Sequence, residues 1–400
     1  MMLPGFYLFL VDRYLRFLQS RQRVQLVSAH VLPCEAVELN FSKIHGLTYN
    51  PTSVVFINIP SISKLQWHPF TVTSNSNLDP EMLSVLIKSE GAWSQKLYQM
   101  LSTPSVIDHL NVHVEGPYGP VSTNFLRHET LVMISGGSGI TPFVSIIREL
   151  IYLNTTLRYR TPKLTLICAF KNTSCLSMLD MILPSYGTNC DISSLQLQIE
   201  AYITRENDLK QNNNPIHLQS VWFKPNEKDS PISSILGPNS WVWLGAIISS
   251  SFIIFIILIG MINHYYVFPI DHNTNKIFSY PLKSSINMLG ICVSIAMVAS
   301  VVVLWNKKQN AKEAKKVQNM EGPSPLVEKD LESLPSQILG HATNVHYGAR
   351  PDLRRLLLEL KGSNVGVLVS GPKEMRQEVA AVCSSNLAEN LHFESFSFNW

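Results

Sequence analysis

Residues 135–142, SGGSGITP, decide how the middle of this chain is expected to fold. They follow a short apolar stretch at 131–135 and precede an amphipathic stretch at 142–153. Consecutive glycines between a strand and a helix let the backbone approach a phosphate, and the first helical turn offers free N–H groups. The stretch is not the GxGxxG fingerprint, so alone it is equally compatible with a plain connection. With its flanks it predicts one strand–turn–helix unit of a parallel sheet.

Similar units continue on both sides of a long interruption. Strands are expected at 163–170, 195–203, 365–370 and 391–398, and helices at 351–360 and 374–383. Upstream, short strands separated by Pro, Gly, Asn and Ser turns are expected at 24–32, 54–59, 70–74, 83–88 and 112–115. Strands of this length and spacing favour an antiparallel β-barrel before the α/β part.

Composition excludes several classes of protein. Charged residues make up 15% of the chain, against roughly 25% in ordinary globular domains. Hydrophobic residues reach 46%, which excludes a disordered chain. The net charge of +3 gives no reason to expect a nucleic-acid partner. The 6 cysteines include no CxxC pair, so they are interpreted as reduced thiols, with no metal site.

Two apolar blocks account for the low charge. No Asp, Glu, Lys or Arg occurs from 230 to 270, and residues 241–262 are long enough to cross a bilayer core of ~30 Å. A second uncharged block covers 286–305. Two buried core helices are the alternative, but core helices of this length usually keep a polar face. Lysines crowd after the second block, at Lys307, Lys308, Lys312, Lys315 and Lys316, which predicts a cytosolic side there and an outside loop at 263–285.

The layout that follows has several domains. Both soluble parts would lie in the cytosol, and the hairpin would interrupt one α/β domain. The expected segments are the end of a truncated membrane helix at 1–20, a β-barrel domain at 21–127, the first part of an α/β domain at 128–238, a transmembrane hairpin at 239–305, a cytosolic linker at 306–343 and the second part of the α/β domain at 344–400.

Two further motifs precede the glycine stretch. HPFT stands at 68–71 and GPYG at 116–119, and the order HPFT, GPYG, GGSGITP is much more specific than any one of them. With these three motifs the chain resembles the ferredoxin–NADP reductase-like flavoenzymes, and within them the plant ferric-chelate reductases, which are relatives of the NADPH oxidases. The resemblance covers nearly the whole chain, including the hairpin inside the nucleotide domain.

The resemblance implies FAD and NADPH as cofactors and assigns residues to each. FAD-side positions would be His68, Pro69, Phe70, Thr71, Lys88, Gly91, Trp93, Ser94, Gly116, Pro117, Tyr118 and Gly119. NADPH-side positions would be Gly136, Gly137, Ser138, Gly139, Ile140, Thr141, Arg205, Ser370, Gly371 and Pro372, with Arg350 as a second basic candidate. Phe398 or Trp400 would cover the flavin. Ser370 stands where many relatives have Cys.

The implied activity is transfer of electrons from NADPH through FAD to a one-electron acceptor, either haem or a ferric chelate, at the plasma membrane. No catalytic acid or nucleophile is required. Family members hold haem with histidine pairs in an upstream bundle, and neither apolar block here contains such a pair. Two alternatives remain: a superoxide-producing NADPH oxidase-like enzyme, which the internal hairpin disfavours, and a non-catalytic membrane protein that keeps the flavoprotein fold.

Overall fold

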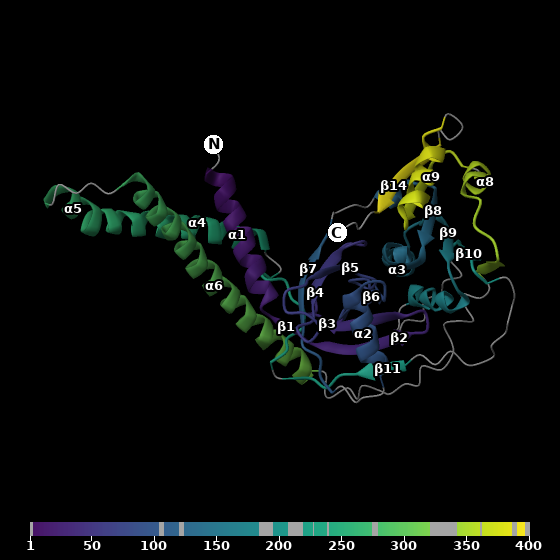
Figure 1. Cartoon of the computed structure of the whole chain (residues 1–400), viewed down its shortest axis with the longest axis horizontal. Coiled ribbons are helices and arrows are strands. Elements are labelled where there is room, and N and C mark those ends of the chain that lie inside the picture. The colour runs from purple at the N-terminus through teal and green to yellow at the C-terminus, as the bar shows by residue number, and fades with distance from the viewer. Residues whose placement is uncertain are drawn as a thin grey trace. The chain divides into compact units, whose positions relative to one another are not determined.

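The structure is a computed structural model of the 400-residue chain. It describes residues 3–103, 108–119, 124–183, 195–206, 219–226, 228–237, 240–273, 279–320, 342–360, 362–385 and 390–396. The chain divides into two compact units (Figure 1). A helical unit comprises Met1–Gln22 and Ile232–Val327, and a unit of strands and helices comprises Arg23–Pro231 and Glu328–Trp400.

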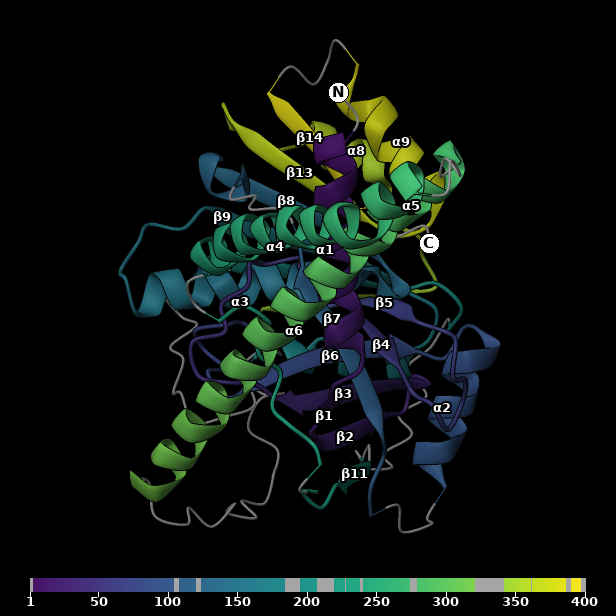
Figure 2. The same ribbon diagram turned by 90° about the vertical axis from the view of Figure 1, so that its left-hand side faces the viewer.

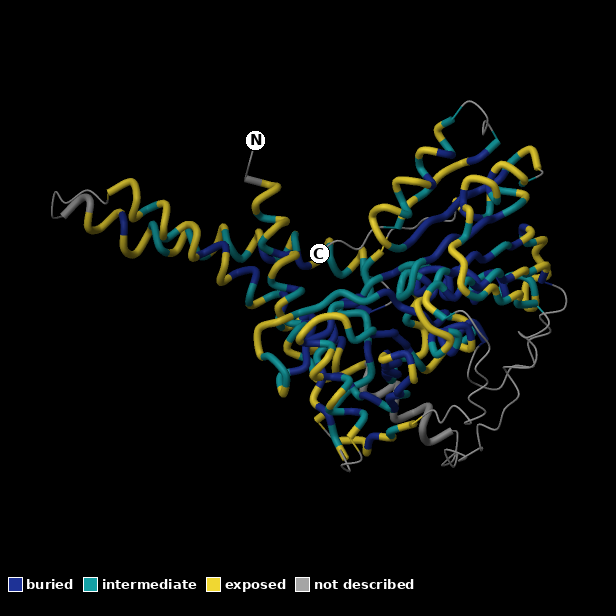
Figure 3. The backbone as a smooth tube through the Cα atoms, turned by 45° about the vertical axis from the view of Figure 1, so that its right-hand side comes forward, coloured by how far each residue is buried: buried dark blue, intermediate teal, exposed yellow. Residues whose placement is uncertain are grey.

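The helical unit is built from three long helices and a short one. They are α1 (Leu3–Ser20), α4 (Ser240–Ile262), α5 (Phe268–Asn273) and α6 (Tyr280–Met320), with a π-helical turn, Asn263–Val267, between α4 and α5. Buried Val11, Ile247 and Ile295 join α1, α4 and α6, which cross one another in Figure 2. Stretches Ser240–Ile270 and Tyr280–Gln309 are both long and apolar enough to cross a membrane. Many of their residues are exposed, as the yellow stretches of these helices in Figure 3 show.

The other unit begins with two antiparallel four-stranded sheets, in the orders β1-β7-β4-β5 and β11-β2-β3-β6. The strands are β1 (Arg23–Val24), β2 (Leu26–Leu32), β3 (Ala36–Ser42), β4 (Val54–Asn58), β5 (His68–Thr71), β6 (Met82–Lys88), β7 (Val112–Tyr118) and β11 (Gln219–Trp222). An isolated bridge from Val72, which follows β5, to Val85 of β6 connects the two sheets. Among the described residues the pairings therefore form two sheets and no closed ring, which differs from the predicted barrel.

A six-stranded parallel sheet follows, in the order β12-β10-β9-β8-β13-β14. The strands are β8 (Thr130–Gly136), β9 (Lys163–Phe170), β10 (Leu197–Ile203), β12 (Thr343–Tyr347), β13 (Val365–Ser370) and β14 (Leu391–Phe396). Alternate residues of β8 face opposite layers. Met133 packs in the cluster that contains α3 (Thr141–Thr155), whereas Val132 packs with α8 (Leu353–Leu358) and α9 (Lys373–Cys383). The expected α/β domain, interrupted between β10 and β12, is confirmed.

Several elements were not predicted from the sequence. Strand β3 carries Glu38 and Asn40, and Asn40 donates to Ser28 Oγ and accepts from Ser84 Oγ, so burial of polar groups hides its alternation. Strands β11 and β12 lie at sheet edges and have few buried side chains. Helix α2 (Ala92–Ser102) contains the predicted FAD-side residues Trp93 and Ser94, where no helix was predicted. Helix α6 runs on to Met320, although a linker was predicted from residue 306.

Candidate functional site

The glycine stretch forms the predicted turn between β8 and α3. Strand β8 ends at Gly136, a 3₁₀ turn covers Gly137–Ile140, and α3 begins at Thr141. Gly137 has a φ of +58°, in the left-handed region that favours glycine. Pro142 occupies the first turn of α3, where its missing N–H removes no helical hydrogen bond. The turn therefore presents backbone amides at the carboxyl end of a central strand.

The second predicted turn, Ser370-Gly371-Pro372, packs directly on the first. Strand β13 pairs with β8 so that Ser370 lies opposite Ser135. A Cβ atom added to Gly139 would lie 2.5 Å from the Ser370 carbonyl oxygen, and one added to Gly136 would lie 2.6 Å from Pro372 Cδ. Only glycine fits at these two positions, because backbone and a ring occupy the space. The structure thus brings both predicted nucleotide-facing turns to one edge of the sheet, the edge where parallel sheets bind ligands.

The HPFT motif forms all of β5, and its side chains gather around Trp93. The His68 and Trp93 ring centroids are 4.6 Å apart, and those of Phe70 and Trp93 are 6.0 Å apart and nearly parallel. Burial lowers the pKa of His68, which favours its neutral form. His68 Nε2 and Trp93 Nε1 are buried, and neither has a hydrogen-bond partner among the described residues. Unpaired buried nitrogens beside aromatic rings fit a planar heteroaromatic ligand that carries its own acceptors.

The segment IKSEGAWS connects the two sites. Gly91 precedes α2, and Ser94 Oγ accepts hydrogen bonds from the backbone N–H groups of Gly91 (3.0 Å) and Glu90 (3.1 Å). Lys88 ends β6, and its Nζ lies 3.7 Å from a Glu90 carboxylate oxygen. The same Nζ lies 3.5 Å from the position that an added Cβ atom on Gly137 would occupy. Lys88 therefore stands beside the glycine turn, where its charge can neutralise phosphate from either dinucleotide.

The remaining predicted positions are more scattered. Gly116 to Tyr118 end β7, and Tyr118 lies opposite Val54 of β4, while Gly119 packs against Ser53. Arg205 follows β10 at the carboxyl edge of the parallel sheet and is exposed, as is Arg350 after β12. The predicted cover residues Phe398 and Trp400 lie outside the described residues. The nearest described aromatic residue is Phe396, whose ring lies edge-on to Phe143 of α3.

Sequence reasoning missed the contacts that hold the two-sheet domain against the α/β domain. The buried Arg148 guanidinium lies 3.3 Å from the Asp79 carboxylate and donates to the carbonyl oxygens of Met181 and Leu183. The Thr52 N–H donates to Ser145 Oγ at 2.9 Å. No local pattern announces these partners, since each contact joins residues far apart in the sequence. Through them α3, which begins at the glycine turn, is fastened to the domain that carries HPFT.

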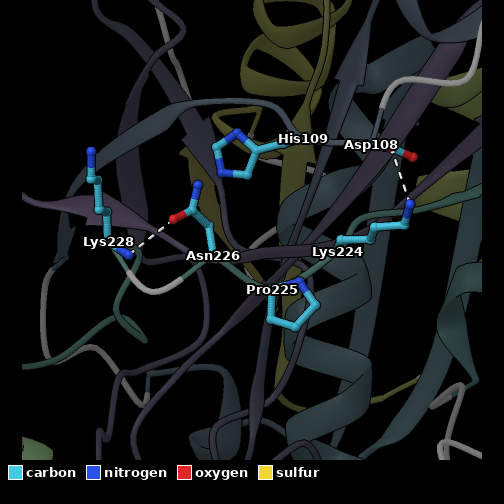
Figure 4. A pocket seen from close by; sticks show the side chains of 6 residues that line it. All are labelled: Asp108, His109, Lys224, Pro225, Asn226 and Lys228. Atoms are coloured by element: carbon cyan, nitrogen blue, oxygen red, sulfur yellow. Dashed lines mark hydrogen bonds and ion pairs between the residues drawn. The ribbon is translucent and has the colours of Figure 1, made fainter.

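A separate cavity of about 380 Å³ lies beside β11 (Figure 4). Its lining residues are Asp108, His109, Lys224, Pro225, Asn226 and Lys228. Lys224 Nζ lies 3.1 Å from Asp108, and His109 Nε2 lies 2.7 Å from Asp229. Its charged groups thus largely pair with one another, and none of the residues expected to bind cofactor lines it. Among the described residues, no group of three or more His, Cys, Asp or Glu could hold a metal ion.

Known proteins resemble this chain in both halves of the strand-and-helix unit. Residues 21–122 match a family described as "FAD-binding domain", and residues 128–384 match "Ferric reductase NAD binding domain". "Ferric reduction oxidase 2" of Arabidopsis thaliana is 57% identical over 410 residues, which cover 100% of this chain and 57% of that protein. "Ferric reduction oxidase 3, mitochondrial" of the same plant is 58% identical, over 99% of this chain and 54% of its own length.

Among solved structures, a Neisseria gonorrhoeae "ferredoxin NADP+ reductase", solved with bound FAD and NADP, matches with a TM-score of 0.42. It is 10% identical to this chain, with 94% of this chain and 98% of that protein covered. This chain spans little more than half the length of the two Arabidopsis relatives.

Proposed function

The chain belongs to the ferric reductase family, and from that premise we propose that it is a membrane flavoprotein oxidoreductase that passes electrons from NADPH through FAD towards haem and ferric chelates. Its FAD-binding and NAD-binding domains supply the two cofactor sites that such a reaction needs. When bound, FAD takes a hydride from NADPH and releases electrons singly. Because the chain spans about 57% of a ferric reduction oxidase, the final acceptor is part of the proposal.

One observation carries the proposal most strongly: four predicted segments meet around Lys88. The glycine turn lies beside the Lys88 ammonium, and the 370–372 turn packs on the glycine turn. Lys88 ends β6, and α2 with Trp93 follows four residues later, stacked on the HPFT strand. With one dinucleotide bound on each side of Lys88, the flavin ring and the nicotinamide ring would both lie toward the boundary between the two domains.

The chain's own groups would bind and orient the cofactors. The 136–141 turn offers amide donors and the positive end of α3 to the NADPH pyrophosphate. The unpaired nitrogens of His68 and Trp93, with the Phe70 ring, offer a partly buried surface to FAD. We assign the FAD-side and NADPH-side residues of the sequence analysis to these roles. Arg205, exposed at the carboxyl edge of the sheet, is proposed to pair with the ribose 2′-phosphate that distinguishes NADPH from NADH.

Helices α4 and α6 are proposed to cross the plasma membrane as a hairpin. Their apolar stretches are long enough, and α4 exposes large side chains such as Phe252, Ile253 and Ile256 that would be unfavourable in water. The lysines that follow residue 305 favour a cytosolic position for that end of α6. Both soluble domains would then be cytosolic, on the NADPH side of the membrane.

A spectroscopic experiment tests the reductase half first. The whole chain is purified in detergent, its bound flavin is measured by visible absorption, and NADPH is added without oxygen. We expect one FAD per chain, with bleaching by NADPH. Trp93→Leu should lose FAD, whereas Trp222→Leu, which changes a half-exposed tryptophan on β11, should retain it. A folded chain without flavin would reject the enzyme in favour of a non-catalytic membrane protein.

The acceptor is tested on the reduced protein. We expect the protein to reduce a dye with NADPH. We expect it to reduce a ferric chelate only when a haem-containing membrane partner is supplied. Superoxide formed at about twice the rate of NADPH consumption, because each NADPH supplies two electrons and each superoxide takes one, would instead favour the oxidase alternative. Reduction of neither dye nor chelate by a flavin that bleaches would contradict electron output altogether.

A further inference from the structure

Two thiols meet at the boundary between the two-sheet domain and the α/β domain. Cys34 lies in the turn between β2 and β3, and Cys175 lies in a 3₁₀ segment, Thr173–Met178, that follows β9. Their side chains are 6% and 5% exposed, and they belong to one buried cluster. The two thiols hydrogen-bond to each other although 140 residues separate them in the sequence. Neither residue belongs to a segment predicted to bind a cofactor.

Polar and charged groups surround the pair. Ser177 Oγ lies 3.8 Å from Cys34 Sγ and donates to the Ser174 carbonyl oxygen at 2.8 Å. The Cys175 N–H donates to the Asn172 carbonyl oxygen at 3.1 Å. Lys88 acts on Cys175 through its charge. A buried thiol with a second thiol, a hydroxyl and a nearby cation differs from an inert core cysteine.

These neighbours separate the acidities of the two thiols. The hydrogen bond with Cys34 is the largest effect on Cys175, and together with the Lys88 charge it lowers the pKa of this thiol against the opposing effect of burial. The same hydrogen bond and burial raise the pKa of Cys34. Of the two thiols, Cys175 is therefore the one that forms a thiolate more readily. A thiolate is the form of cysteine that reacts with oxidants and with disulfides.

We propose that Cys34 and Cys175 form a reversible disulfide when the protein meets a peroxide, so that the pair is a redox modification site linking the two domains. The Cys175 thiolate attacks a peroxide oxygen, the O–O bond breaks, and Cys175 becomes a sulfenic acid as hydroxide leaves and is protonated to water. The Cys34 thiol then attacks the sulfenic sulfur, an S–S bond forms, and a second water leaves. Two thiols are oxidised by two electrons, and one hydrogen peroxide is reduced to two waters.

The location gives the disulfide a direct consequence. Cys34 is carried by the β2–β3 turn, and β3 pairs with β6, which ends at Lys88. Cys175 is carried by the segment that follows β9, a neighbour of β8 and its glycine turn. A covalent bond between them would fix the two cofactor-binding domains to each other beside the proposed path of electrons. In a reducing compartment such bonds are transient, and thiols that form them serve to sense oxidants.

Peptide mass spectrometry of the whole FAD-loaded chain in detergent tests the proposal. The protein is treated with a small excess of hydrogen peroxide, denatured, alkylated and digested without reductant. We expect a cross-linked peptide pair that contains Cys34 and Cys175, a loss of two alkylatable thiols per chain, and full recovery with dithiothreitol. The wild-type protein decides the question without any substitution, and the result does not depend on NADPH oxidation.

Substitutions then check the partners. Cys34→Ser should leave Cys175 as a sulfenic acid that dimedone traps, and Cys175→Ser should remove the peroxide-dependent loss of thiols. Cys383→Ser, outside the pair and half-buried, should behave as wild type. Unchanged thiols in the wild-type protein, disulfides only between chains, or oxidation confined to other cysteines would each overturn the proposal.

Discussion

A methyl group at Gly139 should separate the two nucleotide-facing turns. The added Cβ atom would lie 2.5 Å from the Ser370 carbonyl oxygen, 2.8 Å from its carbon and 3.1 Å from Gly371 Cα. Non-bonded carbon atoms prefer about 3.5–4.0 Å, so the 370–372 turn must move away by about 1 Å. The obstacle is backbone at the end of β13, which is paired on both sides, so no side-chain rotation relieves it. Overpacking of this kind costs about 1–3 kcal/mol.

If that cost falls on the NADPH-binding geometry, the dissociation constant for NADPH in Gly139→Ala should rise about 5- to 150-fold. FAD content should stay at the wild-type level, because the segments proposed to hold FAD belong to the other domain. Anaerobic titration, followed by flavin bleaching, measures both quantities in one sample. Gly245→Ala is the matched control, since its added Cβ meets nothing within 4 Å. Wild-type NADPH affinity with a wild-type melting temperature in Gly139→Ala would refute this reasoning.

Three further outcomes are expected. Arg148→Met should lower the free energy of unfolding by about 3–5 kcal/mol, because Asp79 is left buried without its guanidinium partner, although the Asn75 N–H still donates to it; adding Asp79→Asn should restore part of the stability, and flavin release on heating follows both changes. Burial lowers the pKa of Lys43 to about 8, whereas the unfolded lysine keeps its proton to 10.5. The unfolded state thus binds more protons between these values, so the melting temperature should rise with pH across that window in wild type and not in Lys43→Met. Lys88→Met should weaken dinucleotide binding about tenfold at low ionic strength and less at high salt, as equilibrium titration would measure.

The parallel strands were the most predictable part of the fold. Strands β9 and β13 end at the residues that the sequence indicates, because strands buried on both faces form short, nearly continuous apolar runs between polar turns. The glycine turn was also placed correctly. The HPFT strand covers 68–71, whereas a strand was predicted at 70–74. In each of these cases the decisive physical information is local, so it can be recognised within a few residues.

What could not be predicted depends on partners far away in the chain. Asn40 is polar and yet buried, and only the side chains of Ser28 and Ser84 make that position favourable. Arg148 has the appearance of a surface residue on an amphipathic helix until its partners from other segments are known. The same holds for the pairing of Cys34 with Cys175. A three-dimensional contact between distant segments leaves no periodicity in the sequence, which is why each was missed.

The position of the helical insertion explains how an α/β domain can contain one. The chain leaves the sheet after β10 and returns at β12, which is an edge strand paired only with β10. Strands β8 and β13 end in the proposed nucleotide-binding turns, and they pair with each other. Strand β9 pairs with β8 on one side and with β10 on the other. None of these pairings involves a residue of the insertion. The entropy of closing a connection grows only with the logarithm of its length, about 0.6 kcal/mol for each doubling. An insertion at this edge therefore costs the sheet little, whereas the same insertion between β8 and β13 would interrupt the pair of turns on which cofactor binding is proposed to depend.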